Sequence, residues 1–325
     1  MLATRPESFA ALRDDWNAVL HRSTANTIFS TWEWQSAWWS VFGKECELHL
    51  LGVRSGREVI GIVPLVERGG VFSLVGGVEI SDYLDVIAVR GYEDAVCHAL
   101  LSYVRGQACE LLDLHCLRQD SPTLAYLTEL AVEARLTVEK SEEDVCPAVE
   151  LPSDWDAYVA SLGKKDRHEL RRKLRRLEET GSYRWYAVAP SDGFGPEADA
   201  FLRLCRESRQ EKAAFLSEQV EVFFRLVMSI FGPQGTLKLY FLEVAGRRVS
   251  AVMCFGQGQE LWLYNSGFDP SYASLSVGLL LKAFCIQDAI YSGKRKFDFL
   301  RGREPYKYDL GGVDAPIFRL QVRTR

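Results

Sequence analysis

Apolar side chains recur along the first half of the chain at two periods, which predict helices and strands in turn. Spacings of three and four predict a helix from about Ser8 to Leu20 and a second over Thr31–Gly43. Apolar runs separated by Gly-containing turns predict strands. We expect these over residues 47–54, 58–68, 71–77 and 83–89, followed by a helix over 93–105, a strand over 109–117, a helix over 122–134 and a strand over 148–151.

The second half follows the same order of elements. We expect a strand over residues 182–189, helices over 197–213 and 217–232, three strands within 236–269, a helix over 276–293 and a strand over 296–300. Two helices, an antiparallel meander, a helix and a strand thus occur twice, about 190 residues apart. Chance rarely reproduces such an order, so we predict two tandem α/β (α+β) domains, each a mixed, mainly antiparallel sheet flanked by helices. We place the domains at residues 1–150 and 183–325.

A basic amphipathic helix is predicted between the halves, over residues 151–182. Lys164–Arg176 carries eight basic residues against two acidic ones, a net charge of +6 in thirteen residues. The formal charge of the whole chain is −5, which leaves −11 for the remainder. One interpretation is a solvated helix face. The other is a site for a phosphate-bearing ligand, because Arg and Lys suit phosphate oxygens. Nucleic acid, a nucleotide-sugar, coenzyme A or a lipid surface all meet that demand.

Composition narrows the class of protein. A chain of 325 residues that is 47% apolar and 26% charged is typical of a globular protein with two domains. The acidic balance disfavours a generic nucleic-acid binder. We find no apolar run of about 18 residues and no secretory signal pattern, so we expect no transmembrane helix and a cytoplasmic location. The eight cysteines form no CxxC pair and the five histidines are scattered, so we expect buried reduced thiols and no metal site.

The start of the helix over residues 276–293 is a candidate anion site. Ser274 or Ser276 can cap it, and Gly278 lies in its first turn. Free N–H groups and the helix dipole favour an anion there, and a residue without Cβ lets a diphosphate approach closely. A glycine that only eases packing is the competing interpretation.

The stretch "KFDFLRGREPYKYDLGG", Lys296–Gly312, gathers candidate catalytic groups. Asp298 alternates with two phenylalanines and therefore points to the opposite face of the sheet. It is either a buried acid paired with Arg301, Arg303 or a backbone donor, or a carboxylate beside a cleft that can deprotonate an amine. Glu304 is a second candidate base, and Tyr306 could give a proton to a leaving group.

Three segments carry a resemblance to a known family. "FDFLRGREPYKYDLGG", the preceding helix "SVGLLLKAFCIQDAIYSG" and the upstream "SLGKKDRHELRRKLRRLEE" resemble the GNAT-type acyltransferase domain of the cellulose-biosynthesis CelD-like family. That family is similar to the Fem-type aminoacyltransferases of peptidoglycan synthesis, which hold two GNAT-like folds in one chain. The resemblance covers most of residues 150–325. The first half matches only in the order of its elements and in stretches such as "STWEWQSAWW".

The resemblance implies a donor site between two splayed strands, here "ELWLYNSGF" and "KFDFL". The thioester arm of acyl-coenzyme A, such as acetyl-coenzyme A, would insert there, with its pyrophosphate on the following helix start. The implied cofactor-binding residues are Tyr264, Asn265, Ser276, Val277, Gly278 and Leu279. The usual Gln/Arg-x-x-Gly-x-Gly/Ala loop is absent, and only Gly278 remains of its glycines. In the first half the equivalent position has Glu93 and Asp94, which would repel a pyrophosphate, so that half is predicted to serve acceptor binding or scaffolding.

We therefore predict an N-acyltransferase that moves an acyl group from acyl-coenzyme A to an amine of a small molecule or a saccharide precursor, as in polysaccharide biosynthesis. Asp298 or Glu304 would act as the base and Tyr306 as the proton donor. Anionic parts of donor or acceptor would be held by Arg167, Arg171, Arg172, Arg301, Arg303 and Lys307. One alternative is a Fem-like transferase that uses aminoacyl-tRNA, the one case in which nucleic acid is a partner. The other is a non-catalytic binding module in exopolysaccharide assembly. Peripheral membrane contact through the basic helix is compatible with all three.

Overall fold

The computed structural model describes residues 2–190 and 194–324, which divide into two compact units. Unit 1 consists of residues 1–145 and 316–325, and unit 2 of residues 146–315. The boundaries expected at residues 150 and 182 differ from this division for two reasons. The C-terminal strand lies in the sheet of unit 1, and the basic helix packs into the core of unit 2.

Unit 1 is built on an eight-stranded sheet in the order β1-β2-β3-β4-β6-β14-β7, with β5 paired to β3. Its strands are β1 (Leu2–Pro6), β2 (Glu47–Ser55), β3 (Glu58–Arg68), β4 (Val71–Leu74), β5 (Ile87–Ala88), β6 (Leu111–Arg118), β7 (Thr137–Val145) and β14 (Pro316–Arg323). Its helices are α1 (Phe9–His21), α2 (Trp32–Phe42), α3 (Glu93–Arg105) and α4 (Pro122–Glu133), with short 3-10 turns at Ile28–Ser30 and Gly43–Glu45. The strand expected over residues 83–89 shrinks to β5, and β1, β7 and β14 were not predicted.

Helices cover both faces of this sheet. A Cβ on Gly61 of β3 would meet Val96 of α3, whereas Gly52 lies against Leu12 of α1 and pairs with Ile62. Neighbouring strand residues point to opposite faces, so α1 and α3 lie on opposite sides of β3. The pair β4–β6 is parallel, and β14 lies between β6 and β7, antiparallel to both.

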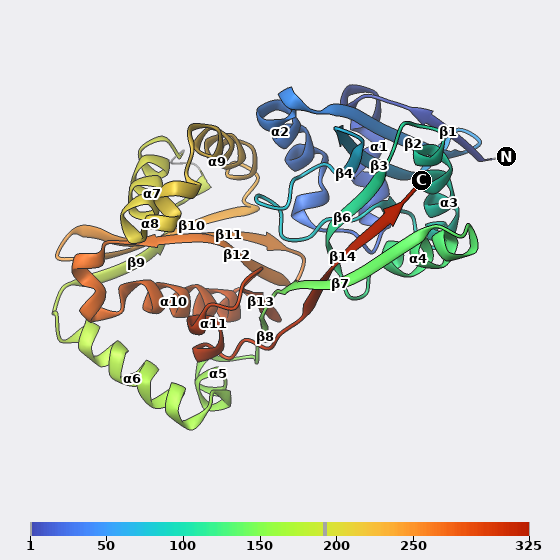
Figure 1. Ribbon diagram of the computed structural model, residues 1–325. Helices are drawn as coiled ribbons and strands as arrows, with labels where there is room; N and C mark the ends of the chain where they lie inside the picture. Colours follow the sequence, from blue (N-terminus) through green and yellow to red (C-terminus); the bar gives the residue numbers. More distant parts are fainter. Residues whose placement is uncertain (1, 191–193, 325) are drawn as a thin grey trace. The chain divides into compact units, whose positions relative to one another are not determined.

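Unit 2 holds a six-stranded sheet in the order β8-β13-β12-β11-β10-β9 (Figure 1). Its strands are β8 (Ala148–Glu150), β9 (Tyr183–Ala187), β10 (Leu237–Val244), β11 (Arg247–Gln257), β12 (Glu260–Phe268) and β13 (Lys296–Asp298). Its helices are α5 (Trp155–Ser161), α6 (Lys164–Glu178), α7 (Gly195–Ser208), α8 (Gln210–Phe215), α9 (Glu218–Phe231), α10 (Val277–Tyr291) and α11 (Pro305–Asp309), with the 3-10 helix η4 over Pro270–Leu275. Seven of the eight cysteines are buried, and none of the eight forms a disulfide.

The helices of unit 2 also form two layers. Gly267 of β12 lies against the backbone of Leu204 and Cys205 in α7, so closely that a Cβ would come within 2.3 Å of the Cys205 nitrogen. The next residue, Phe268, instead contacts Gly278 of α10. The two helices therefore lie on opposite faces, as Figure 1 shows. Leucines of α6 share a buried cluster with α5, α10 and the sheet.

The strands β12 and β13 part from each other halfway along β12. They pair in parallel only from Glu260↔Lys296 to Trp262↔Asp298. Against β11, Tyr264 is skipped by a register shift, because Leu263 and Asn265 pair with successive residues. The second half of β12 thus has no strand on that side among the described residues, and this edge of the sheet opens toward α10 and α11. Unit 1 has the same helix-linked parallel pair in β4-α3-β6, which confirms the predicted repeat of the fold.

Candidate active site

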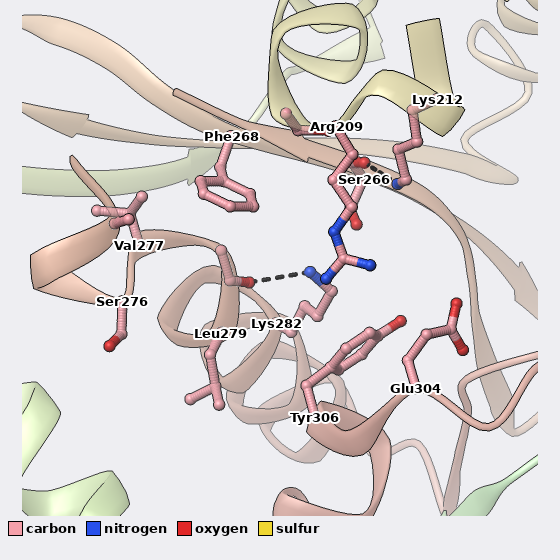
Figure 2. A pocket seen from close by; sticks show the side chains of 13 residues that line it. Arg209, Lys212, Ser266, Phe268, Ser276, Val277, Leu279, Lys282, Glu304 and Tyr306 are labelled. Atoms are coloured by element: carbon pink, nitrogen blue, oxygen red, sulfur yellow. Dashed lines mark hydrogen bonds between the residues drawn. The ribbon is translucent and has the colours of Figure 1, made fainter. Parts of the chain in front are cut away.

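A pocket of about 200 Å³ lies where β12 opens, bounded by α8, the start of α10 and the turn before α11 (Figure 2). Among the residues predicted from sequence, Ser276, Val277, Gly278, Leu279, Glu304 and Tyr306 line it. Sequence analysis missed Ser208, Arg209, Lys212, Ser266, Phe268, Ala273 and Lys282. Figure 2 shows the apolar side chains Phe268, Val277 and Leu279 at one end and the charged groups at the other.

The start of α10 offers backbone donors to the pocket. Ser276 adopts a left-handed conformation, with φ of 57°, and its carbonyl accepts from the N–H groups of Leu279 and Leu280. The N–H groups of Val277 and Gly278 precede the first residue that can bond within the helix. This end of α10 therefore has the donors and the positive dipole end that an anion requires. Serine does not cap it through its side chain, contrary to expectation.

Gly278 lies in a tight packing contact. A Cβ at this position would lie 3.1 Å from Cδ1 of Phe268. The aromatic ring therefore closes over the start of α10, and a larger residue would push it away. This contact supports the packing interpretation of Gly278, and it leaves the adjacent backbone N–H groups available to a ligand.

A break between two helices brings two cations into the pocket. The predicted single helix over residues 197–213 is wrong, because Arg209 is extended (φ −159°) and separates α7 from α8. Lys212 of α8 donates to Oδ1 of Asn265 at 3.1 Å and to the carbonyl of Ser266. Burial lowers the pKa of Lys212. Asn265, predicted as cofactor-binding, thus acts by fixing this lysine.

Lys282 is a buried cation inside an apolar helix. Its side chain donates to the carbonyl of Gly278 at 3.0 Å, and its Nζ lies 4.5 Å from the ring centroid of Tyr306. Burial, reinforced by the charge of Lys212, lowers the pKa of Lys282 to about 7. Burial therefore disfavours the charged form of this lysine.

The turn before α11 is held by Lys307. Leu300 and Gly302 have φ of 56° and 112°, and the Lys307 ammonium donates to the carbonyls of Leu300, Arg301 and Gly302 at 2.7–3.0 Å. This lysine is 1% exposed. Its three protons are spent on the turn, which leaves none for the anion of a ligand. Its role in this structure is therefore to shape the turn.

Glu304 is the carboxylate of the pocket. Its Oε2 is buried, lies 3.0 Å from Nζ of Lys307 and receives no hydrogen bond from the described residues. Burial alone would raise the pKa of Glu304, but the charge of Lys307 outweighs it and holds the pKa below its usual value. The carboxylate is thus ionised at neutral pH and keeps acceptor capacity toward the pocket.

Tyr306 supplies the phenol of the pocket. Burial, with the nearby charge of Glu304, raises the pKa of its hydroxyl. It is therefore protonated at neutral pH and can donate. Tyr264 lies elsewhere: its ring packs on Phe224 and Phe255, with centroids 5.6 Å apart in both pairs, and it is not among the residues that line the pocket.

The structure places Asp298 outside the pocket lining. It is 1% exposed, and its Oδ1 accepts from the N–H of Leu300 at 2.8 Å. Its Oδ2 lies 3.9 Å from Nζ of Lys296. Asp298 thus stabilises the left-handed turn at the end of β13. Arg301 is half-buried in this turn, and Arg303 pairs with Asp314 at 3.0 Å.

The basic helix α6 presents an exposed cationic face. Lys164, His168, Arg171 and Arg175 recur at helical spacing on one side and are exposed. Arg171 and Arg167 line an open groove at the start of the helix with Lys164, Lys165, His168 and Glu169. On α6, two of the predicted ligand-binding arginines have partners within the protein. Arg167 donates to the carbonyl of Ala160, and Arg172 pairs with Glu169 at 2.7 Å.

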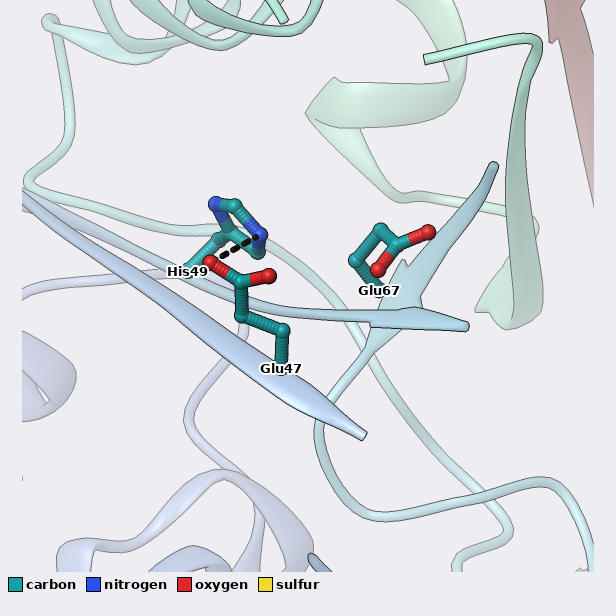
Figure 3. Close-up of side chains that lie close together, drawn as sticks. All are labelled: Glu47, His49 and Glu67. Atoms are coloured by element: carbon teal, nitrogen blue, oxygen red, sulfur yellow. Dashed lines mark ion pairs between the residues drawn. The ribbon is translucent and has the colours of Figure 1, made fainter. Parts of the chain in front are cut away.

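In unit 1, the start of α3 corresponds to the start of α10 in unit 2, and a side chain already occupies it. Glu93 Oε2 accepts from the N–H of Gly91 at 2.6 Å. An acid therefore fills the position that an anionic ligand would take in unit 2. Unit 1 also holds the one described group of three side chains that could ligate a metal, Glu47, His49 and Glu67 (Figure 3). His49 Nε2 lies 3.7 Å from Glu47, and its Nδ1 bonds to the Tyr103 hydroxyl at 2.8 Å.

Comparisons with known proteins agree with this architecture. Residues 164–308 match the family model described as "Acetyltransferase (GNAT) domain". Over 98% of this chain and 96% of the other, the fold is similar to the crystal structure of FemX, with a TM-score of 0.65 and 9% identity. The structure of L-PGS from Bacillus licheniformis is similar with a TM-score of 0.62 and 12% identity, over 96% of this chain and 92% of the other. A tandem GNAT protein from the clavulanic acid biosynthesis pathway is similar with a TM-score of 0.54 and 12% identity, over 100% of this chain and 99% of the other.

The fold is therefore that of tandem GNAT proteins, and the match to the GNAT domain model lies within unit 2 and includes the basic helix. None of the curated proteins matches the sequence. The CelD-like family is not among the findings, so that narrower assignment stays a prediction. No helix in the described part of the chain is long and apolar enough to cross a membrane.

Proposed function

We propose that the pocket of unit 2 is the active site of an N-acyltransferase that transfers an acyl group from a thioester donor, acyl-coenzyme A, to an amine. The observation that carries this proposal is the joint position of Glu304, Tyr306 and the free N–H groups of α10 at one pocket in a GNAT domain. The anionic end of the donor would lie at Val277 and Gly278, and its acyl arm would enter along the open edge of β12.

Each step uses a group that the pocket provides. The acceptor ammonium gives one proton to Glu304, and the resulting amine attacks the carbonyl carbon of the thioester. A C–N bond forms and the C–S bond breaks. The second proton of the nitrogen reaches the leaving thiolate through Tyr306, and Glu304 then loses its proton to solvent. Of the two carboxylates considered from sequence, Glu304 is favoured because it lines the pocket, whereas Asp298 bonds to the turn.

A second candidate uses aminoacyl-tRNA as donor. The exposed face of α6 favours it, because Lys164, Arg171 and Arg175 extend over about 16 Å of helix, at 1.5 Å per residue, which is more positive charge than a small donor needs. Unit 1, with Glu93 at its helix start, would support acceptor binding or scaffolding in either case.

Calorimetric titration with acetyl-coenzyme A and, separately, with aminoacyl-tRNA distinguishes these functions. Binding of acetyl-coenzyme A with release of free thiol in the presence of amines supports the first. Binding of aminoacyl-tRNA alone supports the second. Binding of neither donor would contradict both and favour the non-catalytic binding module, whose ligand would then be sought among saccharides.

A further inference from the structure

Three cations at the polar end of the pocket have no carboxylate partner within the described part of the chain. Arg209, Lys212 and Lys282 line the same pocket. The two lysines bond to an amide and to backbone carbonyls, which are neutral acceptors, and no hydrogen bond is described for the Arg209 guanidinium. The one acid of the pocket, Glu304, has its ion pair with Lys307 instead. The pocket therefore holds an excess of positive charge.

This excess is costly without an anion. Lys282 is 6% exposed, and a buried cation without a counter-charge destabilises the charged form. Burial is the main cause of the lowered pKa values of Lys212 and Lys282, and the charge of Glu304 opposes the shift without cancelling it. Arg209 adds a third cationic side chain to the same end of the pocket. A ligand that brings a negative group to these donors removes the penalty.

The same end of the pocket also calls for a positive group. Glu304 is 42% exposed on its side chain and faces Nζ of Lys307 at 3.0 Å, but the three protons of Lys307 point to backbone carbonyls, so the buried Oε2 keeps acceptor capacity. A buried acceptor left without a donor is unfavourable. A ligand ammonium would supply the missing donor beside the ionised carboxylate.

We infer that the acceptor is an α-amino acid, or the end of a molecule that carries a free one, bound with its ammonium group at Glu304 and its carboxylate at Arg209 and Lys212. The inference rests on the proposed function for the fate of the amine, but the binding itself does not. Both charged ends must fit into about 200 Å³, which suits adjacent amine and carboxylate groups rather than distant ones. Arg and Lys donors are the usual partners of a carboxylate.

The test is equilibrium binding by calorimetry in the absence of donor. The twenty standard L-amino acids are titrated singly, and the best is compared with its amide, its decarboxylated amine and its des-amino acid. We expect each of these three analogues to bind at least about tenfold more weakly, because each leaves one charged partner unmatched. Arg209→Gln and Lys212→Gln should each lower the affinity for the amino acid about tenfold and change the affinity for its amide little. The matched control is Arg225→Gln, at an exposed position of α9, where the arginine pairs with Asp199.

The outcomes separate this inference from the proposed function. Acyl transfer to simple amines, with no preference for a carboxylate and no change in Arg209→Gln, would overturn the inference and leave the function intact. Amino-acid binding that needs Arg209 and Glu304, without turnover of any donor, would support the inference and overturn the function. If Arg209→Gln instead weakens the binding of acetyl-coenzyme A, the cations bind the donor and the inference fails. Absence of amino-acid binding in the native protein overturns it as well.

Discussion

The guanidinium of Arg176 donates to the main-chain carbonyl of Ser274 across 2.9 Å. This bond joins the last turn of the basic helix to η4, the 3-10 turn that leads directly into Ser276 and the start of α10. The last turn of α6 is thus attached to the segment that leads into the pocket. A donor whose phosphates lie at the start of α10 can therefore extend along α6.

If α6 extends the donor site, removal of its exposed charges should weaken the donor and leave folding intact. We expect Arg171→Gln combined with Arg175→Gln to lower donor affinity about tenfold and to flatten its dependence on salt, because fewer counterions are released. The melting temperature should change little, since solvated charges contribute little to stability. Calorimetry at two salt concentrations, beside thermal unfolding, measures both.

The matched control for that experiment is Arg203→Gln, at an exposed position of α7, where the arginine pairs with Glu207. The double variant and the control remove charges of the same kind from exposed helices. Equal affinity in both would mean that the face of α6 is only a solvated surface.

Removal of β14 should unfold unit 1. This strand pairs with β6 on one side, from Ile317↔Arg118, and with β7 on the other. A chain that ends at Ala315 leaves β7 without a described partner strand and β6 paired only with β4, which costs many backbone hydrogen bonds. We expect hydrogen exchange to lose its protection throughout β6 and β7 while unit 2 stays protected.

A synthetic peptide of residues 316–325 added in trans should restore that protection, as in strand complementation. Arg319→Gln provides a graded comparison, because it removes only the ion pair with Asp113 at 2.7 Å and keeps the strand. It should lower the melting temperature by a few degrees. A truncated chain with native exchange in β6 would refute this account of unit 1.

The stability of unit 1 should depend on pH through His115. Hydrogen bonds to Asp113 and Glu143 raise the pKa of this histidine to about 9, above the 6.5 of a free side chain. The protonated form is favoured by the folded state, so its contribution is full below pH 6.5 and is lost as the pH rises through about 9. We expect a loss on the order of 1–3 kcal/mol over this range.

Urea unfolding of the native protein and of His115→Gln at pH 6, 7.5 and 9 measures this effect. The free energy of unfolding should fall with rising pH in the native protein and should change less in the variant. Curves that stay parallel would show that the imidazolium does not stabilise the fold.

The sequence predicted the fold well because hydrophobic periodicity is local and was repeated in both halves. It also located the start of α10, Glu304 and Tyr306, since a helix start and a polar turn after an apolar strand are visible in the residues themselves. Arg209 was missed because the helical pattern continues across the break. β14 was missed as part of unit 1 because no local pattern shows which sheet a terminal strand joins. Lys282 had a usable signal: it is the one cation in the apolar stretch "VGLLLKAFCI".

The two candidate bases can be separated by comparing their effects on turnover and on stability. Glu304→Gln keeps the shape of the side chain and removes the proton acceptor from the pocket, so we expect kcat to fall by about 10²–10⁴ while donor affinity survives. Asp298→Asn weakens the acceptor that holds the N–H of Leu300 in its left-handed turn. It should therefore lower the melting temperature, with a smaller loss of kcat.

Steady-state rates at saturating donor and thermal unfolding of the same samples decide between them. A matched comparison is Asp314→Asn, which removes an exposed ion pair with Arg303 near the same turn and should change neither quantity strongly. The opposite pattern, with kcat lost in Asp298→Asn at an unchanged melting temperature, would make Asp298 the base. Because Asp298 is 1% exposed, that result would also require the turn from Leu300 to Glu304 to open when the acceptor binds. The same opening would release Lys307 from the three carbonyls that it now holds, and would free it to bind an anion as the sequence first suggested.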